Sequence, residues 1–193
     1  MPSQTRPRQI ILFFILLLPI TGFPSEKLSA ETSLKIRARE HFDTVWIHQK
    51  NLDDTYSYGG IGPNINIWLE DPYRFSIGLS YSVLFINNSK ETELPDFGSN
   101  MDLTKYGIEG KIYFNPGEGG MFTRIGVSHD VLNTKGSAGT INGLGRYLGL
   151  GWEIKFSKIG LALEVAGRRI ELEKNIRIDT YSPSIGVHFY GYI

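Results

Sequence analysis

Beyond residue 30, apolar residues alternate with small or polar ones at a period of two over most of the chain. In the clearest stretch, from Phe75 to Phe85, every second residue is apolar, and Ser76, Gly78 and Ser80 occupy the other parity. Successive side chains of a strand point to opposite faces, so this pattern predicts a β-strand with one apolar face and one small, polar face.

The same alternation recurs in seven further segments, which predicts about eight strands and an all-β fold. The first segment is the least regular because Glu40 interrupts its apolar parity. Helical apolar spacing does not persist anywhere along the chain. The seven segments lie near residues 34–39, 61–69, 106–114, 123–128, 147–156, 159–166 and 185–190.

The connections between these segments alternate between short and long. Three are tight and rich in Pro, Gly and Asp, at Glu70–Arg74, Asn115–Gly120 and Ser157–Lys158. Short turns at one end and longer loops at the other are typical of transmembrane barrels. We therefore predict an eight-stranded antiparallel up-and-down transmembrane β-barrel. The four longer polar segments are His48–Thr55, Asn87–Met101, Asn133–Gly145 and Glu171–Asp179.

The direction of the two faces decides between a membrane barrel and a soluble one, because a lipocalin-like barrel alternates with its apolar face inward. An eight-stranded lumen is just wide enough for side chains to fill it. The polar face supplies small residues such as Gly107 and Gly149, whereas the Leu, Ile, Val and Phe of the other face would overfill that space. We expect Leu79, Ile112 and Leu163 to face outward.

Charged residues of both signs occur on the predicted inner face of neighbouring strands. A buried charge is tolerated only when it is paired and hydrogen-bonded, so we expect these residues to form ion pairs across a narrow lumen. In the alternative interpretation they are solvent-facing charges on a half-buried sheet. The predicted lumen network comprises Glu109, Lys111, Arg124, Glu153, Lys155 and Glu164.

Residues 1–30 have the pattern of a secretory signal peptide, which leaves 31–193 as one barrel domain. Two arginines precede the uncharged run Ile10–Ile20, and Ala30 is the small residue that a signal peptidase accepts. The run is shorter than the roughly 20 residues that a spanning helix needs. An uncleaved short anchor is the alternative, and Pro19 and Pro24 disfavour it because they would break such a helix.

Composition excludes several kinds of partner and site. Lys and Arg number 20 and Asp and Glu number 20, without a basic run, so nucleic acid is not an expected partner. The absence of cysteine excludes disulfides, thiolate metal sites and a catalytic thiol. The histidines His41, His48 and His188 lack metal-ligand spacing, and the glycines of 136–151 run into a strand where a phosphate-binding loop would precede a helix. We expect neither a metal nor a cofactor.

Residues 31–193 resemble the small outer-membrane β-barrel families, the eight-stranded group that includes the transmembrane domain of OmpA and OmpX. The resemblance is carried by the strand pattern and by Ile185–Ile193, which is similar to the terminal targeting strand of such proteins but ends in Ile193, not in an aromatic residue. It implies a place in the cell outer membrane, contact with outer-membrane lipid, and handling by the barrel-assembly machinery during insertion. The sequence does not indicate what the external loops bind, and Asn87–Met101 is the longest of them.

The favoured hypothesis is a non-enzymatic outer-membrane barrel with a structural or surface-interaction role. The alternatives are a narrow pore or OmpW-like conduit for small apolar molecules, a lipid A-modifying enzyme, and a soluble periplasmic lipocalin-like barrel.

The enzyme hypothesis rests on Ser128, His129 and Asp130. PagL-like lipid A deacylases carry His-x-Ser-Asn, whereas this chain continues from His129 with Asp130 and Val131 and lacks that nucleophile. Parity also places Ser128 on the face opposite His129, where it could not be activated. We therefore predict no catalytic residues.

Overall fold

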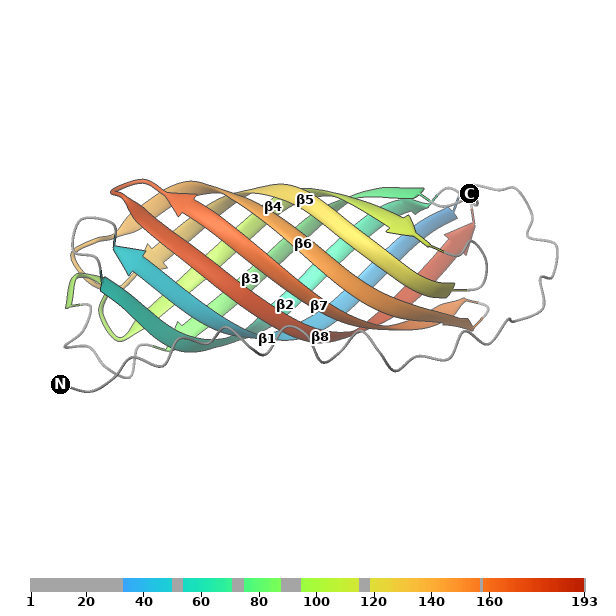
Figure 1. Ribbon diagram of the computed structural model, residues 1–193, viewed down its shortest axis with the longest axis horizontal. Coiled ribbons are helices and arrows are strands. Elements are labelled where there is room, and N and C mark those ends of the chain that lie inside the picture. Colours follow the sequence, from blue (N-terminus) through green and yellow to red (C-terminus); the bar gives the residue numbers. More distant parts are fainter. Residues whose placement is uncertain are drawn as a thin grey trace.

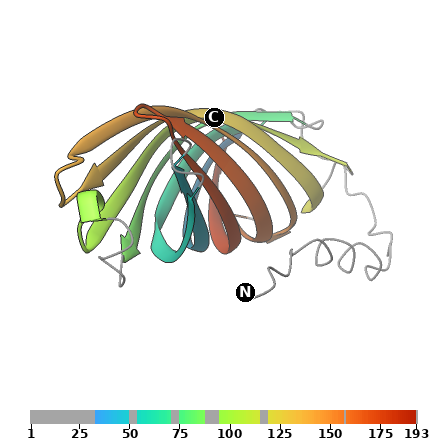
Figure 2. The ribbon, with the colours of Figure 1, turned by 60° about the vertical axis from the view of Figure 1, so that its left-hand side comes forward.

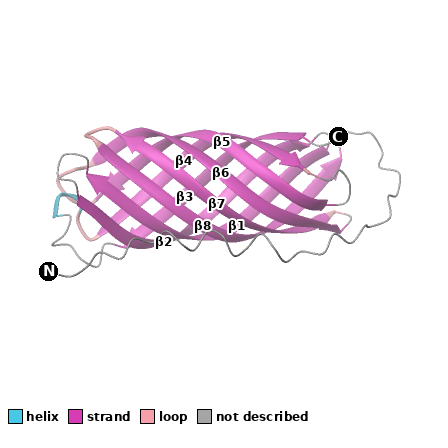
Figure 3. Ribbon diagram, in the orientation of Figure 1, coloured by secondary structure: helices cyan, strands magenta, loops and turns pink. Residues whose placement is uncertain are grey.

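The computed structural model describes residues 33–49, 54–70, 75–87, 95–114, 119–156 and 158–192. The predicted signal peptide, residues 1–30, lies outside these ranges. Within them, no helix is long and apolar enough to cross a membrane. The short 3-10 helix η1 (Pro95–Phe97) lies at one end of the molecule (Figure 3).

Eight strands close into a barrel in which each strand pairs with its neighbours in chain order and β8 pairs back with β1 (Figure 1). Every pairing is antiparallel. The predicted eight-stranded antiparallel up-and-down fold is therefore confirmed. The strands are β1 (Ser33–Gln49), β2 (Asp54–Glu70), β3 (Phe75–Asn87), β4 (Asn100–Tyr113), β5 (Gly119–Thr134), β6 (Thr140–Phe156), β7 (Ile159–Leu172) and β8 (Ile176–Tyr192).

The strands are staggered as they pass around the barrel. Following paired residues once around from Arg37 leads back to β1 at Ile47, ten residues further along the same strand. A stagger of this kind requires strands tilted by roughly 40° to the barrel axis, and Figure 2 shows this slant. We call the end that carries the β1–β2, β3–β4, β5–β6 and β7–β8 connections the loop end, and the opposite end the terminal end.

In the part of the barrel toward the terminal end, the large apolar side chains face outward. Leu79 and Leu163 are 62% and 61% exposed, whereas Glu109 and Glu153 are 1% and 0% exposed. The predicted direction of the two faces is therefore confirmed, and an apolar-inside barrel at this level is excluded. Along β3 the outward apolar run extends from Phe75 to Phe85, which after tilting covers roughly 25 Å of barrel height. We call this zone, which surrounds the barrel, the apolar belt.

The strands at the loop end are longer than the sequence predicted. The polar segments expected as loops at 133–145 and 171–179 are mostly strand, and half of 48–55 is strand; the residues left between the strands are 50–53, 135–139 and 173–175. The last connection is tight because Lys174 and Asn175 both adopt the left-handed conformation (φ 61° and 58°) that two-residue hairpin turns use. The prediction of loops here was wrong because it relied on apolar residues on the outer face, and the outer face of these segments is polar.

β1 is a regular strand despite the irregular position noted in the sequence. Its side chains alternate between buried and exposed from Lys35 to Thr44, and Glu40 takes its place on the outer face between Pro63 of β2 and Ile185 of β8. The break in apolar parity is therefore a single outward carboxylate, and it leaves the strand intact.

Candidate functional site in the barrel lumen

β1 alone shows how the sequence fills the lumen in successive levels. Its inward residues are Lys35 near the terminal end, then Arg37 and Arg39, and finally Val45 and Ile47 near the loop end. All five are buried. The other strands follow the same order, so the lumen has two charged groups toward the terminal end and an apolar group toward the loop end.

The terminal-side group is centred on the carboxylate of Glu153. Lys35 and Lys111 both form ion pairs with it, and the Tyr113 hydroxyl donates a hydrogen bond to it at 2.9 Å. At the mouth of the lumen, Lys155 donates to Glu70 at 3.2 Å. We define the terminal-side group by its charged members Lys35, Glu70, Lys111, Glu153 and Lys155.

The middle group is organised by two further carboxylates. Glu164 is contacted by Arg37 at 2.9 Å and Arg39 at 3.3 Å, and Arg124 also pairs with it. Arg124 donates from its other terminal nitrogen to Glu109 at 2.8 Å, and this single guanidinium therefore joins β4, β5 and β7 across the lumen.

The middle group continues toward the loop end with two more ion pairs and a hydrogen bond. Lys105 pairs with Glu109 at 2.8 Å, Arg168 pairs with Asp130, and the His41 ring is hydrogen-bonded to Asp43 at 2.7 Å. We define the middle group by its charged members Arg37, Arg39, Asp43, Lys105, Glu109, Arg124, Asp130, Glu164 and Arg168.

Glycines opposite the charged residues leave room for them. A Cβ on Gly149 would lie 2.6 Å from a carboxylate oxygen of Glu164, and one on Gly186 would lie 2.7 Å from Nε of Arg37. The small residues on the inner parity of the sequence are therefore needed for the ion pairs to fit.

The structure places the six predicted lumen residues in two separate groups. Lys111, Glu153 and Lys155 belong to the terminal-side group, and Lys155 is partly exposed there. Glu109, Arg124 and Glu164 belong to the middle group.

Several residues of the two charged groups were not predicted. Lys35, Arg37 and Arg39 lie on the polar parity of the first segment, but the irregular pattern of that segment left them outside the predicted network. Asp130 and Arg168 lie near segments that were expected to be loops.

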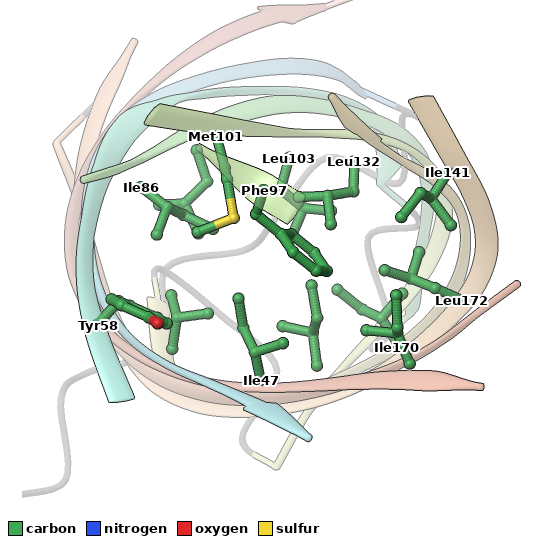
Figure 4. Packing of buried hydrophobic residues seen from close by; sticks show 14 residues of the cluster. Ile47, Tyr58, Ile86, Phe97, Met101, Leu103, Leu132, Ile141, Ile170 and Leu172 are labelled. Atoms are coloured by element: carbon green, nitrogen blue, oxygen red, sulfur yellow. The ribbon is translucent and has the colours of Figure 1, made fainter. Parts of the chain in front are cut away.

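An apolar group fills the loop end of the lumen, and sequence reasoning missed it. Its side chains come from all eight strands and from η1, and Figure 4 shows them pointing into the barrel with Phe97 among them. Such residues would have been found by looking for inward apolar positions beyond the belt. We call this the apolar cluster; its buried members are Val45, Ile47, Tyr58, Leu84, Ile86, Phe97, Met101, Leu103, Leu132, Ile141, Ile170, Leu172, Ile176 and Ile178.

Hydrogen bonds between connections hold η1 over the apolar cluster. The backbone N–H groups of Gly136 and Ala138 donate to the carbonyls of Phe97 and Asp96 at 3.2 and 2.8 Å. Gly136 cannot be replaced without movement, because a Cβ there would lie 2.2 Å from the Asp96 carbonyl oxygen. Lys174 also donates to the Ala138 carbonyl at 2.9 Å. The described parts of three connections are thus joined above the lumen.

The Ser128, His129, Asp130 segment does not assemble a catalytic site. Ser128 and Asp130 point inward and bond to each other at 2.7 Å, whereas His129 is exposed on the outer face. The residues that the structure describes also contain no group of three or more His, Cys, Asp or Glu side chains placed to hold a metal.

Outside the barrel, the polar surface near the loop end includes a small charged cluster around Asp179. Arg169 contacts it at 2.8 Å, Arg177 at 3.3 Å and His48 at 3.1 Å. Partial burial lowers the pKa of His48, and the charge of Arg177 lowers it further, while Asp179 opposes both.

A closed eight-stranded antiparallel barrel, apolar on its outer face and ion-paired within, has the fold of the small outer-membrane β-barrels. No protein-family model matches the chain, and no curated protein matches it. Among solved structures, it is similar to Neisserial surface protein A, NspA, with 14% identity, 81% of this chain and 96% of that chain covered, and a TM-score of 0.53.

The chain is also similar to Ail, the attachment invasion locus protein of Yersinia pestis. The identity is 10%, the match covers 82% of this chain and 99% of Ail, and the TM-score is 0.56. A structure of Ail with the heparin analogue sucrose octasulfate matches at 12% identity, 82% and 99% coverage and a TM-score of 0.51. At these identities the likeness establishes the fold.

Proposed function

We propose that the protein is an integral outer-membrane β-barrel with a closed lumen, and that it acts through the surface it exposes at the loop end. The observation that carries this proposal is the pairing of an exposed apolar belt with buried ions inside it. A height of roughly 25 Å matches the apolar band of outer-membrane barrels. In water, such a belt would be a large exposed apolar surface, which soluble monomeric proteins avoid.

A closed lumen is favoured over a pore or a conduit for apolar molecules. Ion pairs cross the lumen in the terminal-side and middle groups, and the apolar cluster fills the remaining level. A cavity of about 30 Å³ in the middle group is far smaller than the roughly 300–1,000 Å³ of ligand pockets. We expect no steady ion current from the purified protein in a planar bilayer, and a reproducible current would contradict this part of the proposal.

A surface-interaction role is supported by the rigid wall that the strands build beyond the belt. Outward residues there are polar, including Ser57, Asp102, Asn142 and Asp179, and they stand on paired strands. One structural neighbour, Ail, is named for attachment and was crystallised with a sulfated heparin analogue. We propose that this polar wall is the surface that meets external partners.

Cysteine labelling tests membrane insertion and orientation, because the natural chain contains no cysteine. Three single variants of exposed residues sample the three zones: Thr140→Cys at the loop end, Leu163→Cys in the belt and Lys158→Cys at the terminal end. A membrane-impermeant maleimide should label T140C on intact cells, K158C only after the outer membrane is opened, and L163C only after unfolding.

A folded-state control separates failed insertion from a wrong assignment. Each variant should shift its gel mobility on boiling, as intact small barrels do. If folded L163C is labelled as fast as T140C, the belt is in water and the membrane proposal fails. If K158C is labelled on intact cells and T140C is not, the orientation is reversed.

A further inference from the structure

A cavity of about 30 Å³ lies among the side chains of the middle group. Side chains from all eight strands line it, among them Arg39, Asp43, Lys105, Tyr147 and Arg168. A single ordered water needs roughly 10–15 Å³ measured in this way. The space therefore suits one or two waters or one halide ion, and it is too small for sulfate or phosphate.

Several buried polar atoms of the residues lining this cavity have no partner within the described part of the chain. Three are donors, Nε of Arg39, Nε of Arg168 and the hydroxyl of Tyr147; the others are Nε2 of His41 and the amide oxygen of Asn64. Buried donors are nearly always satisfied by protein, water or a bound ion, because an unmade hydrogen bond is costly away from bulk water. The residues that line the cavity therefore carry at least three unused hydrogen-bond donors against one unused acceptor.

Within the described chain, and leaving His41 aside, the middle group holds one more cationic side chain than carboxylates. It contains five cationic side chains, Arg37, Arg39, Lys105, Arg124 and Arg168, against four carboxylates, Asp43, Glu109, Asp130 and Glu164. The carboxylate of Asp43, which also lines the cavity, is engaged by His41 and Ser182. A charge without a counterion is unfavourable in a buried site.

The terminal-side group also has one more cationic side chain than carboxylates, but one of its cations is exposed to solvent. Among the described residues, Lys35, Lys111 and Lys155 pair with Glu70 and Glu153, and the Lys155 side chain is 22% exposed at the lumen mouth, where solvent can balance its charge. The middle group lies between this layer and the apolar cluster and has no such outlet within the described chain.

We propose that the cavity of the middle group binds one monovalent halide ion, chloride in the cell. The ion supplies the missing negative charge and accepts hydrogen bonds from Arg39, Arg168 and Tyr147. It thereby completes the ion-pair network that closes the lumen. This assignment depends on the lumen contacts and does not require the proposed surface role.

Refolding in different anions tests the proposal. The full barrel is refolded from denaturant into detergent with bromide, chloride or gluconate as the sole anion. Crystals grown in bromide should show one anomalous scattering peak in the cavity. The thermal unfolding midpoint should be at least about 2 °C higher in either halide than in gluconate, which is too large to enter.

Variants separate the cavity from general salt effects. Tyr147→Phe removes one donor and keeps the ring, and it should shrink the halide-dependent shift; Arg39→Gln should abolish it. Lys158→Gln removes an exposed charge at the terminal end and should keep the full shift. A gel-mobility shift on boiling shows that each variant is folded, so that loss of halide binding is distinguishable from loss of the barrel.

Two outcomes would overturn the proposal. Equal midpoints in all three anions, with no bromide peak, would show that the cavity holds water alone. A halide-dependent shift that persists unchanged in both Y147F and R39Q would place the effect elsewhere on the protein.

Discussion

The two halves of the lumen are filled in opposite ways, although the same eight strands surround both. Toward the terminal end the interior consists of ion pairs, and toward the loop end it consists of the apolar cluster. The outer face is reversed, because the apolar belt surrounds the charged half and polar residues surround the apolar half. At each level of the barrel one face of the wall is apolar and the other is polar or charged, and the two faces exchange these roles between the terminal end and the loop end.

This double reversal has a physical cause if the belt lies in lipid. Lipid tails are as apolar as leucine, so no hydrophobic effect would drive leucine into the lumen there. Ion pairs and hydrogen bonds, which have no substitute in hydrocarbon, hold that half together. Beyond the belt the wall meets water, and burying apolar side chains becomes the favourable term again. The loop end thus uses the interior of a soluble barrel and the belt uses that of a membrane barrel.

The largest effect should come from breaking the charged half. Glu164→Gln keeps the shape of the side chain but removes the carboxylate that Arg37, Arg39 and Arg124 share. Removing one partner of a buried ion pair costs about 3–5 kcal/mol, because the remaining charges are left uncompensated. Urea titration of the refolded protein in lipid vesicles measures the free energy of unfolding.

Glu173→Gln is the matched control for that substitution. Glu173 is exposed in the β7–β8 turn, so its replacement should change the free energy of unfolding by no more than about 0.5 kcal/mol. A loss below about 1 kcal/mol for Glu164→Gln would mean that water reaches the middle group and screens it.

The apolar half should respond to lost volume. Leu103 is fully buried in the apolar cluster, and Leu103→Ala should cost about 2–5 kcal/mol through lost burial and the cavity left behind. The same change in the belt, Leu163→Ala, leaves no cavity because a lipid tail can fill the space, and we expect a loss below about 1 kcal/mol. Equal losses at both positions in the same vesicle titration would contradict the difference between inside and outside.

Within the belt, most of the fold could be predicted from the sequence. There the inner face is small or charged and the outer face is apolar. Residues such as Leu79 and Glu109 therefore indicate both the strand alternation and which face points into the lumen. The charged network was predicted in part for the same reason, since Arg124 and Glu164 lie on regular strands.

At the loop end the same method failed for a physical reason. Inward residues such as Leu103 and Ile178 are apolar there, and their outward neighbours are polar. The apolar residues therefore change from the outer to the inner parity, and the polar outer face makes these segments look like loops. Pairings that join distant strands, such as Arg37 with Glu164, depend on the stagger of the closed barrel, which no local pattern contains.

The smallest effect concerns the boundary between the two halves on the outer face. Arg146 and Arg169 are both exposed and lie directly opposite each other on β6 and β7, and Asp179 pairs only with Arg169 of the two. Like charges directly opposite are unfavourable, so Arg146→Glu should stabilise the barrel by about 0.2–1 kcal/mol. The gain should shrink as salt is raised from 0.01 to 1 M, where the screening length falls from about 30 to 3 Å. Arg146→Gln, which removes the repulsion without adding an attraction, should give a smaller gain. No gain for either variant at low salt would mean that both guanidiniums are already neutralised by an anionic group bound from outside, and that the boundary is a site of contact with lipid headgroups.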